Sequence, residues 1–193
     1  MSRTQQPGFV GAARQSLAGS AVVGALAFVA NYILVYAMMV IDDVEFTGTD
    51  VEMWKIAGWV FYNAQNVKIE VTSAGRSRTI DYLSAAPSAS NLTSTVPKLA
   101  YYVVPALVLL VAGYVAYQRS NRSLGAESAA GVGAAIAGGY VVLSAAGVFV
   151  FEYTQSSLNT TGTAAPKLST AILVAGLVYP VVLGAIGGYF GVN

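Results

Sequence analysis

The chain has 193 residues, of which 55% are apolar and only 10% are charged, against about 25% charged residues in soluble domains, so we expect a membrane protein rather than a soluble one. Its mean hydropathy is +0.61, and its net charge of +1 provides no bulk attraction to nucleic acid. Because Cys and His are both absent, disulfides, thiolate chemistry, the usual general base and the usual zinc ligands are excluded.

The first predicted membrane span covers residues 17–41 and follows a polar tail that contains Arg3 and Arg14. This apolar run exceeds the roughly 20 residues that a helix needs to cross a bilayer. A cleavable signal peptide is the alternative, because basic residues precede the run. Val35-Tyr36-Ala37, however, is a poor match to a cleavage site. The apolar part of a signal peptide is only about 7–15 residues long, which favours an uncleaved span.

Residues 42–97 form the one sizeable polar segment, which we expect to be a small α+β insertion. Its first acidic residues, Asp42, Asp43 and Glu45, are either a site for a hard cation at the membrane surface or a solvated face adapted to high salt. Their spacing matches no calcium-binding loop, so we favour the solvated face.

A helix is predicted over residues 50–65 of the insertion, with Thr49 and Glu52 at the spacing of a capping box. Apolar residues recur on one side of it at 100° per residue, and polar ones lie opposite. The apolar side comprises Met53, Trp54, Ile56, Ala57, Val60, Phe61 and Ala64, and the polar side Glu52, Lys55 and Asn63. Trp54, Trp59 and Tyr62 favour a membrane-interface position, and the alternative is a helix packed on its own small domain.

Residues 67–83 are predicted to form a β-hairpin, because apolar and polar side chains alternate from Val67 onward with the period of a half-buried strand. A two-residue turn at Ala74-Gly75 sets the register, which a bulge would shift by one. The expected cross-strand pairs are Ile69 with Ile80, Lys68 with Asp81, and Val67 with Tyr82.

The rest of the chain alternates between apolar runs and short connections. A loop with Arg119 and Arg122 follows the second predicted span, and a polar loop over residues 152–167 precedes the fourth. The three further spans are predicted over residues 98–117, 126–151 and 168–190. The chain therefore divides into residues 1–41 (tail and first span), 42–97 (insertion) and 98–193 (the other spans).

The basic residues beside the spans predict the orientation. Arg3, Arg14, Arg119 and Arg122 lie in the N-terminal tail and the second loop, and basic residues in short flanking segments remain cytoplasmic. We therefore expect both termini in the cytoplasm and residues 42–97 and 152–167 outside the cell, although Lys98 and Lys167 favour the reverse. Candidate glycosylation sequons on the outer side begin at Asn91 and Asn159, whereas the sequon at Asn121 falls inside and should be unused.

Two stretches of the chain resemble each other, which predicts an internal repeat of helix, outer loop, Pro-Lys-Leu and helix. The matching elements are Pro97-Lys98-Leu99, Pro105 and Gly113-Tyr114 in one copy, and Pro166-Lys167-Leu168, Pro180 and Gly188-Tyr189 in the other. Each copy crosses the membrane twice, so the copies share one orientation and are related by an axis along the membrane normal. The expected fold is an all-α membrane protein: a four-helix transmembrane bundle of two parallel-related hairpins, with the extracellular α+β insertion between the first two spans.

Asn31 is the only strongly polar side chain in the middle of a predicted span, since Glu127 and Glu152 lie at the ends of the third. It lines a substrate path or forms an interhelical hydrogen bond, and we favour the hydrogen bond, which contributes about 0.6–2 kcal/mol. Pro105 and Pro180 each remove a backbone donor and are expected to kink their helices. Broken helices line transporter sites, but prolines are also ordinary in membrane helices.

Small residues are abundant in the third and fourth spans, among them Gly131, Gly184 and Gly188. Small side chains allow helix backbones to approach closely, so we expect these residues to pack helices within one bundle or in a homo-oligomer, with the third helix at the centre.

The composition as a whole, with little Lys, much Ala, Val, Gly and Thr, and acidic residues outside the apolar runs, resembles that of the uncharacterised multi-pass membrane proteins of haloarchaea. This resemblance implies an archaeal cell-membrane protein and carries no functional residues with it.

Two functions are compatible with these features. The first is a structural, assembly or interaction subunit without catalytic activity, whose insertion meets a partner and whose small-residue faces meet other helices. The alternative is a small permease or channel with a path between the two hairpins. No G-x-S-x-G, Walker, H-E-x-x-H or kinase motif is present, so we expect no enzyme, no catalytic, cofactor-binding or metal residues, and no partner beyond the lipid bilayer, a second copy or a membrane complex.

Overall fold

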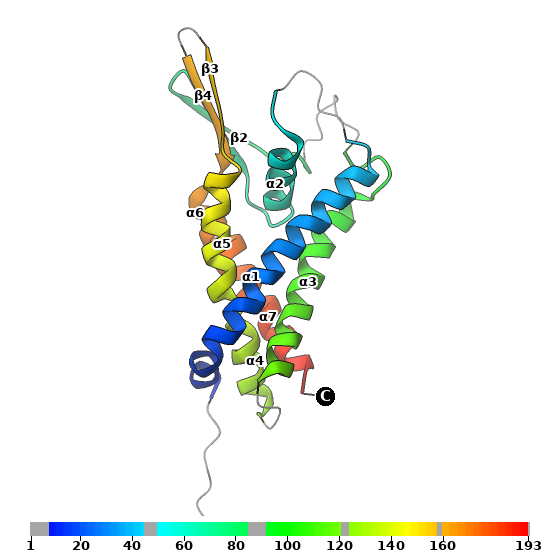
Figure 1. Cartoon of the computed structure of the whole chain (residues 1–193), viewed down its shortest axis with the longest axis vertical. Helices are drawn as coiled ribbons and strands as arrows, with labels where there is room; N and C mark the ends of the chain where they lie inside the picture. The colour runs from blue at the N-terminus through cyan, green and yellow to red at the C-terminus, as the bar shows by residue number, and fades with distance from the viewer. Residues whose placement is uncertain (1–7, 45–49, 85–91, 121–123, 158–159, 193) are drawn as a thin grey trace, which may run out of the picture. The chain divides into compact units, whose positions relative to one another are not determined.

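The computed structural model describes residues 8–44, 50–84, 92–120, 124–157 and 160–192, and the structural statements below concern these residues. The fold is mostly helical, as expected, and Figure 1 follows the chain through its helices from blue to red. In the described part, four helical runs are long and apolar enough to cross a membrane: Phe9–Ile41, Lys98–Arg119, Ala126–Val150 and Leu168–Phe190. Each of the four predicted spans corresponds to one of these runs.

The first two runs are single helices and the last two are not. Helix α1 (Phe9–Ile41) begins eight residues before the predicted span, and α3 (Lys98–Arg119) continues unbroken past Pro105. The last two runs are each divided into shorter helical elements. The third run consists of α4 (Ala126–Ala134) and α5 (Ala137–Val150), and the fourth of α6 (Leu168–Thr170), the π-helix η1 (Ala171–Val178) and α7 (Tyr179–Phe190).

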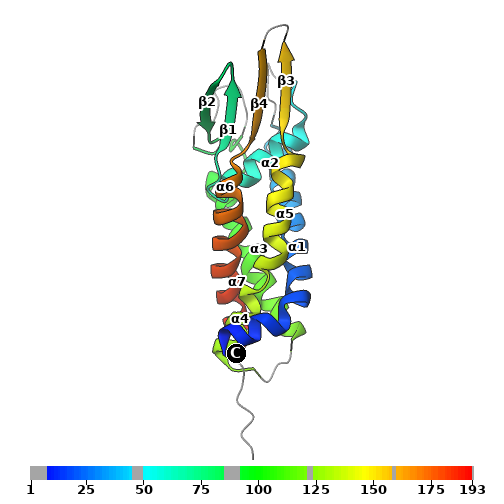
Figure 2. The same ribbon diagram turned by 90° about the vertical axis from the view of Figure 1, so that its left-hand side faces the viewer.

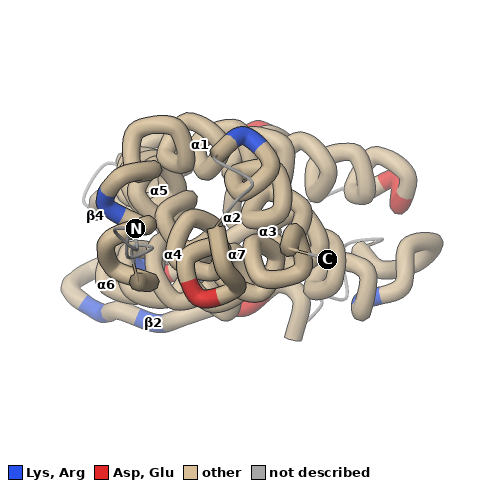
Figure 3. Tube along the Cα trace, turned by 90° about the horizontal axis from the view of Figure 1, so that it is seen from below, with Lys and Arg blue, Asp and Glu red and all other residues tan. Residues whose placement is uncertain are grey.

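By its internal contacts the chain divides into two compact units. Unit 1 comprises Met1–Val29, Ala106–Leu143 and Gly176–Asn193, and unit 2 comprises Ala30–Pro105 and Ser144–Ala175. The described part of unit 1 is helical, whereas unit 2 contains parts of the helices together with a β-sheet. Charged residues are few along the helices, so most of the trace in Figure 3 is tan.

The sheet of unit 2 has four antiparallel strands in the order β2-β1-β4-β3 (Figure 2). Strands β1 (Ile69–Ser73) and β2 (Arg76–Ile80) form the predicted hairpin, and Ile69 pairs with Ile80 as expected. Both turn residues, Ala74 and Gly75, have positive φ (50° and 72°), which matches the right-handed twist of hairpin strands. The pairs expected for Lys68 and Val67 lie beyond the ends of these strands.

A second hairpin completes the sheet, and the prediction of a polar loop at residues 152–167 is therefore wrong. Strands β3 (Tyr153–Ser157) and β4 (Thr160–Pro166) pair with each other, and β4 pairs with β1. The polar sequence of β3 and β4 lacks the alternation of apolar residues that is typical of a half-buried strand. These two strands are therefore recognised only in the structure, where β4 pairs with β1. Because an isolated hairpin is marginally stable, each hairpin stabilises the other across the β1–β4 junction.

Helix α2 (Met53–Asn63) lies in unit 2, within the predicted range 50–65. Glu52 is its N-cap residue and makes no side-chain capping bond, so the expected capping box does not form on the Glu52 side, and Thr49 lies outside the described residues. All residues from Ile56 to Asn63 are buried, so the predicted polar side is wrong for the last two turns. The reason is Asn63, which donates to the carbonyl of Val67 (2.8 Å) and accepts from the amide of Tyr82 (2.8 Å).

Candidate functional site

Polar side chains within the helices of unit 2 bind backbone carbonyls of neighbouring helices. The Tyr62 hydroxyl of α2 donates to the carbonyl of Ser144 in α5, and the Ser144 hydroxyl donates to the carbonyl of Ala171 at 2.8 Å. All three residues are fully buried. Burial raises the pKa of the Tyr62 phenol far above its usual range, so the hydroxyl retains its proton and remains a donor. The insertion is thereby connected through α5 to the first residue of the π-helix.

A second serine stabilises the break in the third span. In a continuous helix the amide of Ile136 would donate to the carbonyl of Val132, but it donates to Gly133 instead (3.3 Å). The Ser20 hydroxyl, from α1, donates to the Val132 carbonyl at 3.1 Å, so the acceptor freed by the break is satisfied. Both groups belong to unit 1.

Sequence reasoning missed these two serines. Neither Ser20 nor Ser144 carries a distinctive motif, and a serine inside an apolar run is usually bonded to its own helix. The nearest signal was the glycine density of the third span, because glycine weakens a helix interior and favours a break.

Asn31 and Pro105, both named from sequence, lie together in unit 2. The Asn31 amide donates to the carbonyl of Pro105 at 3.4 Å, and Asn31 is fully buried. The interhelical hydrogen bond favoured from sequence is therefore present between α1 and α3. Pro180 lies at the start of α7, directly after the π-helix.

The three glycines named from sequence lie at helix crossings in unit 1. A Cβ on Gly131 would overlap the backbone of Phe9, and one on Gly188 would overlap that of Ala129. A Cβ on Gly184 would stand 2.5 Å from the carbonyl oxygen of Gly133. At these crossings only a hydrogen atom fits between the backbones, which brings α4 against α1 and α7. The third run is also the most buried: 61% of its apolar 18-residue stretch lies inside the structure, against 33–39% for the other runs.

Asp42 is a buried anchor at the end of α1, so the expectation of a solvated acidic face is wrong for this residue. It is 2% exposed, and its carboxylate accepts hydrogen bonds from the amides of Thr93 (2.9 Å), Thr95 (2.8 Å) and Val96 (2.6 Å) and from the Tyr101 hydroxyl (2.6 Å). Burial by itself would raise the pKa of Asp42, but the Tyr101 hydroxyl and the three amides outweigh it and hold the pKa below its usual range.

The alternative of a cation site at this acidic group receives no geometric support. Asp43 is exposed, Glu45 lies outside the described residues, and no three acidic side chains gather around a common point in the described ranges. The Asp42 oxygens face hydrogen-bond donors, which are not metal ligands. This carboxylate therefore fastens the end of α1 to the start of α3.

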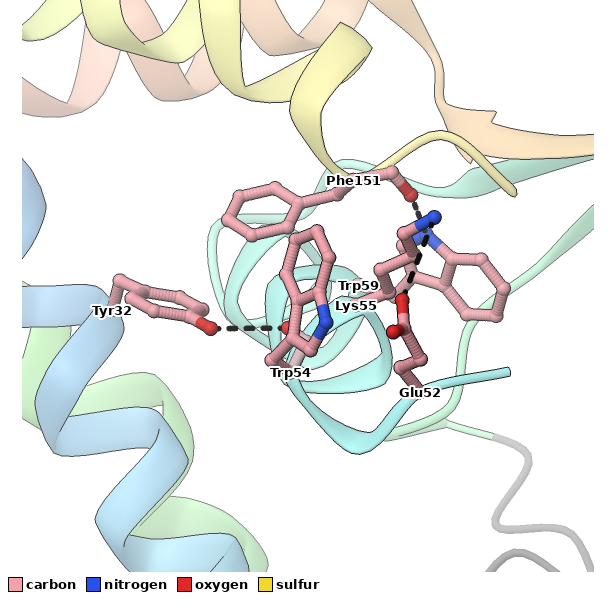
Figure 4. Close-up of polar contacts among 6 residues, drawn as sticks. All are labelled: Tyr32, Glu52, Trp54, Lys55, Trp59 and Phe151. Carbon is pink, nitrogen blue, oxygen red and sulfur yellow. Dashed lines mark hydrogen bonds and ion pairs between the residues drawn. The ribbon is translucent and has the colours of Figure 1, made fainter. Parts of the chain in front are cut away.

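Aromatic side chains join α2 to α1 and α5, as Figure 4 shows. The Tyr32 hydroxyl donates to the carbonyl of Trp54 (3.1 Å), and the Trp59 indole N–H donates to the carbonyl of Phe151 (2.8 Å). A Cβ on Gly58 would overlap the Phe151 ring, so a glycine is required where this ring lies on α2. Trp54 is 37% exposed, whereas Trp59 is buried, so only Trp54 retains the exposure that an interface position requires.

Lys55 and Glu52 are the two charged side chains in Figure 4, and Lys55 lies among the aromatic rings. Its ammonium lies 3.8 Å from a Glu52 carboxylate oxygen, 5.3 Å from the centre of the Trp54 ring and 5.7 Å from that of Tyr153. Glu52 is exposed, and an ion pair at the surface contributes little to stability. Contacts between an ammonium group and aromatic rings contribute about 0.5–1 kcal/mol. The cluster thus joins elements and presents no nucleophile beside a base.

The sequons at Asn91, Asn121 and Asn159 lie outside the described residues. The described side chains define a helical protein with four runs long and apolar enough to cross a membrane, whose polar contacts bind helices and strands together. The chain belongs to DUF7978, a family of unknown function, and the match covers residues 1–193. No curated protein and no solved structure matches it.

Proposed function

We propose that this protein is a non-catalytic structural or assembly subunit of the cell membrane, whose four-stranded sheet is the docking element outside the cell. The observation that carries the proposal is the β1–β4 pairing, which joins the two connecting segments into one sheet. Segments that share a sheet lie on one side of the membrane, in agreement with two hairpins that cross it in the same sense. A two-stranded hairpin now precedes the helix in both copies, which supports the repeat.

The charge distribution supports the orientation. Seven of the nine acidic residues lie in residues 42–97. The N-terminal tail contains Arg3 and Arg14, and Arg119 and Arg122 lie at the loop between the second and third runs. Short basic segments remain in the cytoplasm. We therefore propose that the termini are cytoplasmic and that the sheet is extracellular.

Three features favour a structural subunit over a permease. The one polar amide named from sequence as a path-lining group, Asn31, is buried and bonded to a helix backbone. Glycine crossings such as Gly184 on Gly133 bring the helix backbones together. Ion-coupled carriers use charged groups at depth, and the described Asp, Glu, Lys and Arg residues of the four runs lie near their ends.

The topology is testable because the chain has no native Cys. A membrane-impermeant maleimide should label the exposed β1 residue in Ser73→Cys on intact cells, whereas Val192→Cys near the C-terminus should react only after permeabilisation. The reverse pattern would contradict the proposal. Replacement of the β3–β4 turn region by a Gly-Ser linker should remove the native membrane complex on a blue native gel while the level of protein in the membrane is unchanged.

The second candidate, a small permease or channel, is favoured by one specific observation. The third run is broken between α4 and α5 and the fourth contains the π-helix η1, and both kinds of irregularity recur at transporter sites. Solute flux into liposomes decides between the two. Selective flux that Asn31→Leu abolishes and that Gln155→Leu, at an exposed position outside the four runs, leaves intact would establish the permease.

A further inference from the structure

Two lysines lie directly opposite each other where the sheet joins the fourth apolar run. Strand β4 continues into α6 through Lys167, as Figure 2 shows. The Lys167 amide donates to the Lys68 carbonyl at 3.0 Å, which extends the β1–β4 ladder by one pair beyond Ile69 and Pro166. Residues opposite each other in an antiparallel ladder have their side chains on one face, with Cβ atoms about 4.5–5.5 Å apart. The two lysines, both exposed, therefore form a lysine pair on one face of the sheet.

No carboxylate neutralises the lysine pair. Neither Lys68 nor Lys167 forms an ion pair with any residue that the structure describes. The acidic residues beside Lys68 in the hairpin are bonded elsewhere. Glu70 accepts from a serine hydroxyl of β2 at 2.9 Å, and Asp81, directly after β2, accepts from the amides of the two residues at 83 and 84 (3.0 and 3.1 Å). Because like charges directly opposite each other are destabilising, an anion between the two ammonium groups would stabilise this arrangement.

The lysine pair lies at the level of the lipid headgroups. Lys167 directly precedes the fourth run, Leu168–Phe190, which has 23 residues. A helical run of this length is roughly 30–35 Å long, close to the hydrocarbon thickness of about 30 Å, so its ends lie near the lipid phosphates. Leu168 is apolar and exposed, so the start of the run is open to lipid. Lysine side chains near the end of a membrane helix extend toward the headgroups.

The chemistry of the lysine pair matches a lipid phosphate. Each ammonium group has three N–H donors and no acceptor. A phosphodiester has two charged oxygens that accept, so one phosphate can bridge both lysines through charge-assisted hydrogen bonds. Basic residues at the membrane surface recognise anionic headgroups in this way.

We propose that Lys68 and Lys167 form a binding site for the phosphate of an anionic membrane lipid. The bound headgroup joins β1 of the sheet to the start of the fourth run, and the lipid chains lie against the exposed side of that run. The site holds the base of the sheet at the membrane surface. This inference requires the fourth run to span the membrane, and it is independent of whether the protein is a structural subunit or a permease.

The test measures lipid binding to the full-length protein, purified in detergent and freed of its own lipid, by native mass spectrometry. The protein should bind dioleoyl phosphatidylglycerol about tenfold more tightly than dioleoyl phosphatidylcholine, whose choline group cancels the phosphate charge. Lys68→Gln and Lys167→Gln should each weaken phosphatidylglycerol binding about fivefold, and the double variant roughly twenty-fivefold. The charge-preserving double variant, Lys68→Arg with Lys167→Arg, should retain the lipid preference.

The matched control is Arg76→Gln with Arg78→Gln, which removes the same charge from exposed positions of β2 and should leave the affinity unchanged. Equal affinity for the two lipids, or equal losses in the lysine and arginine variants, would overturn the proposal. Displacement of phosphatidylglycerol by excess inorganic phosphate would assign the lysine pair to soluble anions and also overturn it. Far-ultraviolet circular dichroism reports folding; if the double glutamine variant does not fold, the single variants and the lipid preference of the unaltered protein decide.

Discussion

The Asp42 anchor yields the sharpest prediction about stability. In Asp42→Asn one carboxylate oxygen becomes an NH₂ group, which faces either the amides of Thr95 and Val96 or the donors of Thr93 and Tyr101. In either orientation at least one partly buried backbone amide loses its acceptor, since only the Tyr101 hydroxyl can turn to accept from the NH₂ group, and the remaining hydrogen bonds lose the carboxylate charge. Each such loss costs about 1–3 kcal/mol, so the variant should be about 2–4 kcal/mol less stable once partial relaxation is allowed.

Thermal unfolding in detergent, followed by circular dichroism, measures this loss. For a chain of this size each kcal/mol corresponds to roughly 2–4 °C, so Tm should fall by about 4–16 °C. Asp43→Asn is the matched control, since Asp43 is exposed and lies in the left-handed region (φ 50°), which asparagine tolerates. If Asp42→Asn and Asp43→Asn melt together with the unaltered protein, the anchor has no energetic role.

The Asp42 contribution should also depend on pH. The pKa of Asp42 is lower in the folded protein than the value of about 3.9 for an unfolded chain, so its contribution is complete above about pH 4. The contribution decreases as the pH falls through the folded pKa, because the Asp42 carboxyl group is then protonated in the folded protein as well as in the unfolded chain. The difference in Tm between the unaltered protein and Asp42→Asn should therefore be constant near neutral pH and shrink below about pH 4. A difference that grows on acidification would contradict this reasoning.

Three substitutions test the helix contacts. Gly184→Ala should destabilise the protein by about 1–3 kcal/mol through overlap with the Gly133 carbonyl, whereas Gly19→Ala, which meets no atom within 4 Å, should be neutral or stabilising in the same melting assay. Gly58→Val should displace the Phe151 ring and change near-ultraviolet circular dichroism; an unchanged spectrum would rule out the close contact. Ser144→Ala should speed amide exchange at the start of the π-helix, since the buried bond to Ala171 is lost, and unaltered exchange would refute the link.

The sequence by itself determined the elements whose signals are local. The apolar runs predicted all four helical spans because length and hydropathy are properties of consecutive residues. Alternation around Ala74-Gly75 predicted the first hairpin and its Ile69–Ile80 pair for the same reason. Asn31 was correctly assigned an interhelical hydrogen bond, because an amide in an apolar run needs a polar partner.

Only the tertiary structure decided the features that depend on a distant partner. The β3–β4 segment became a hairpin because β1 provides its neighbour, and the polar face predicted for α2 disappeared because Asn63 binds the hairpin. Asp42 became an anchor because amides some fifty residues away converge on it. Such contacts leave no periodic trace in the sequence, since the energy of a buried polar group depends on where its donors and acceptors lie in space.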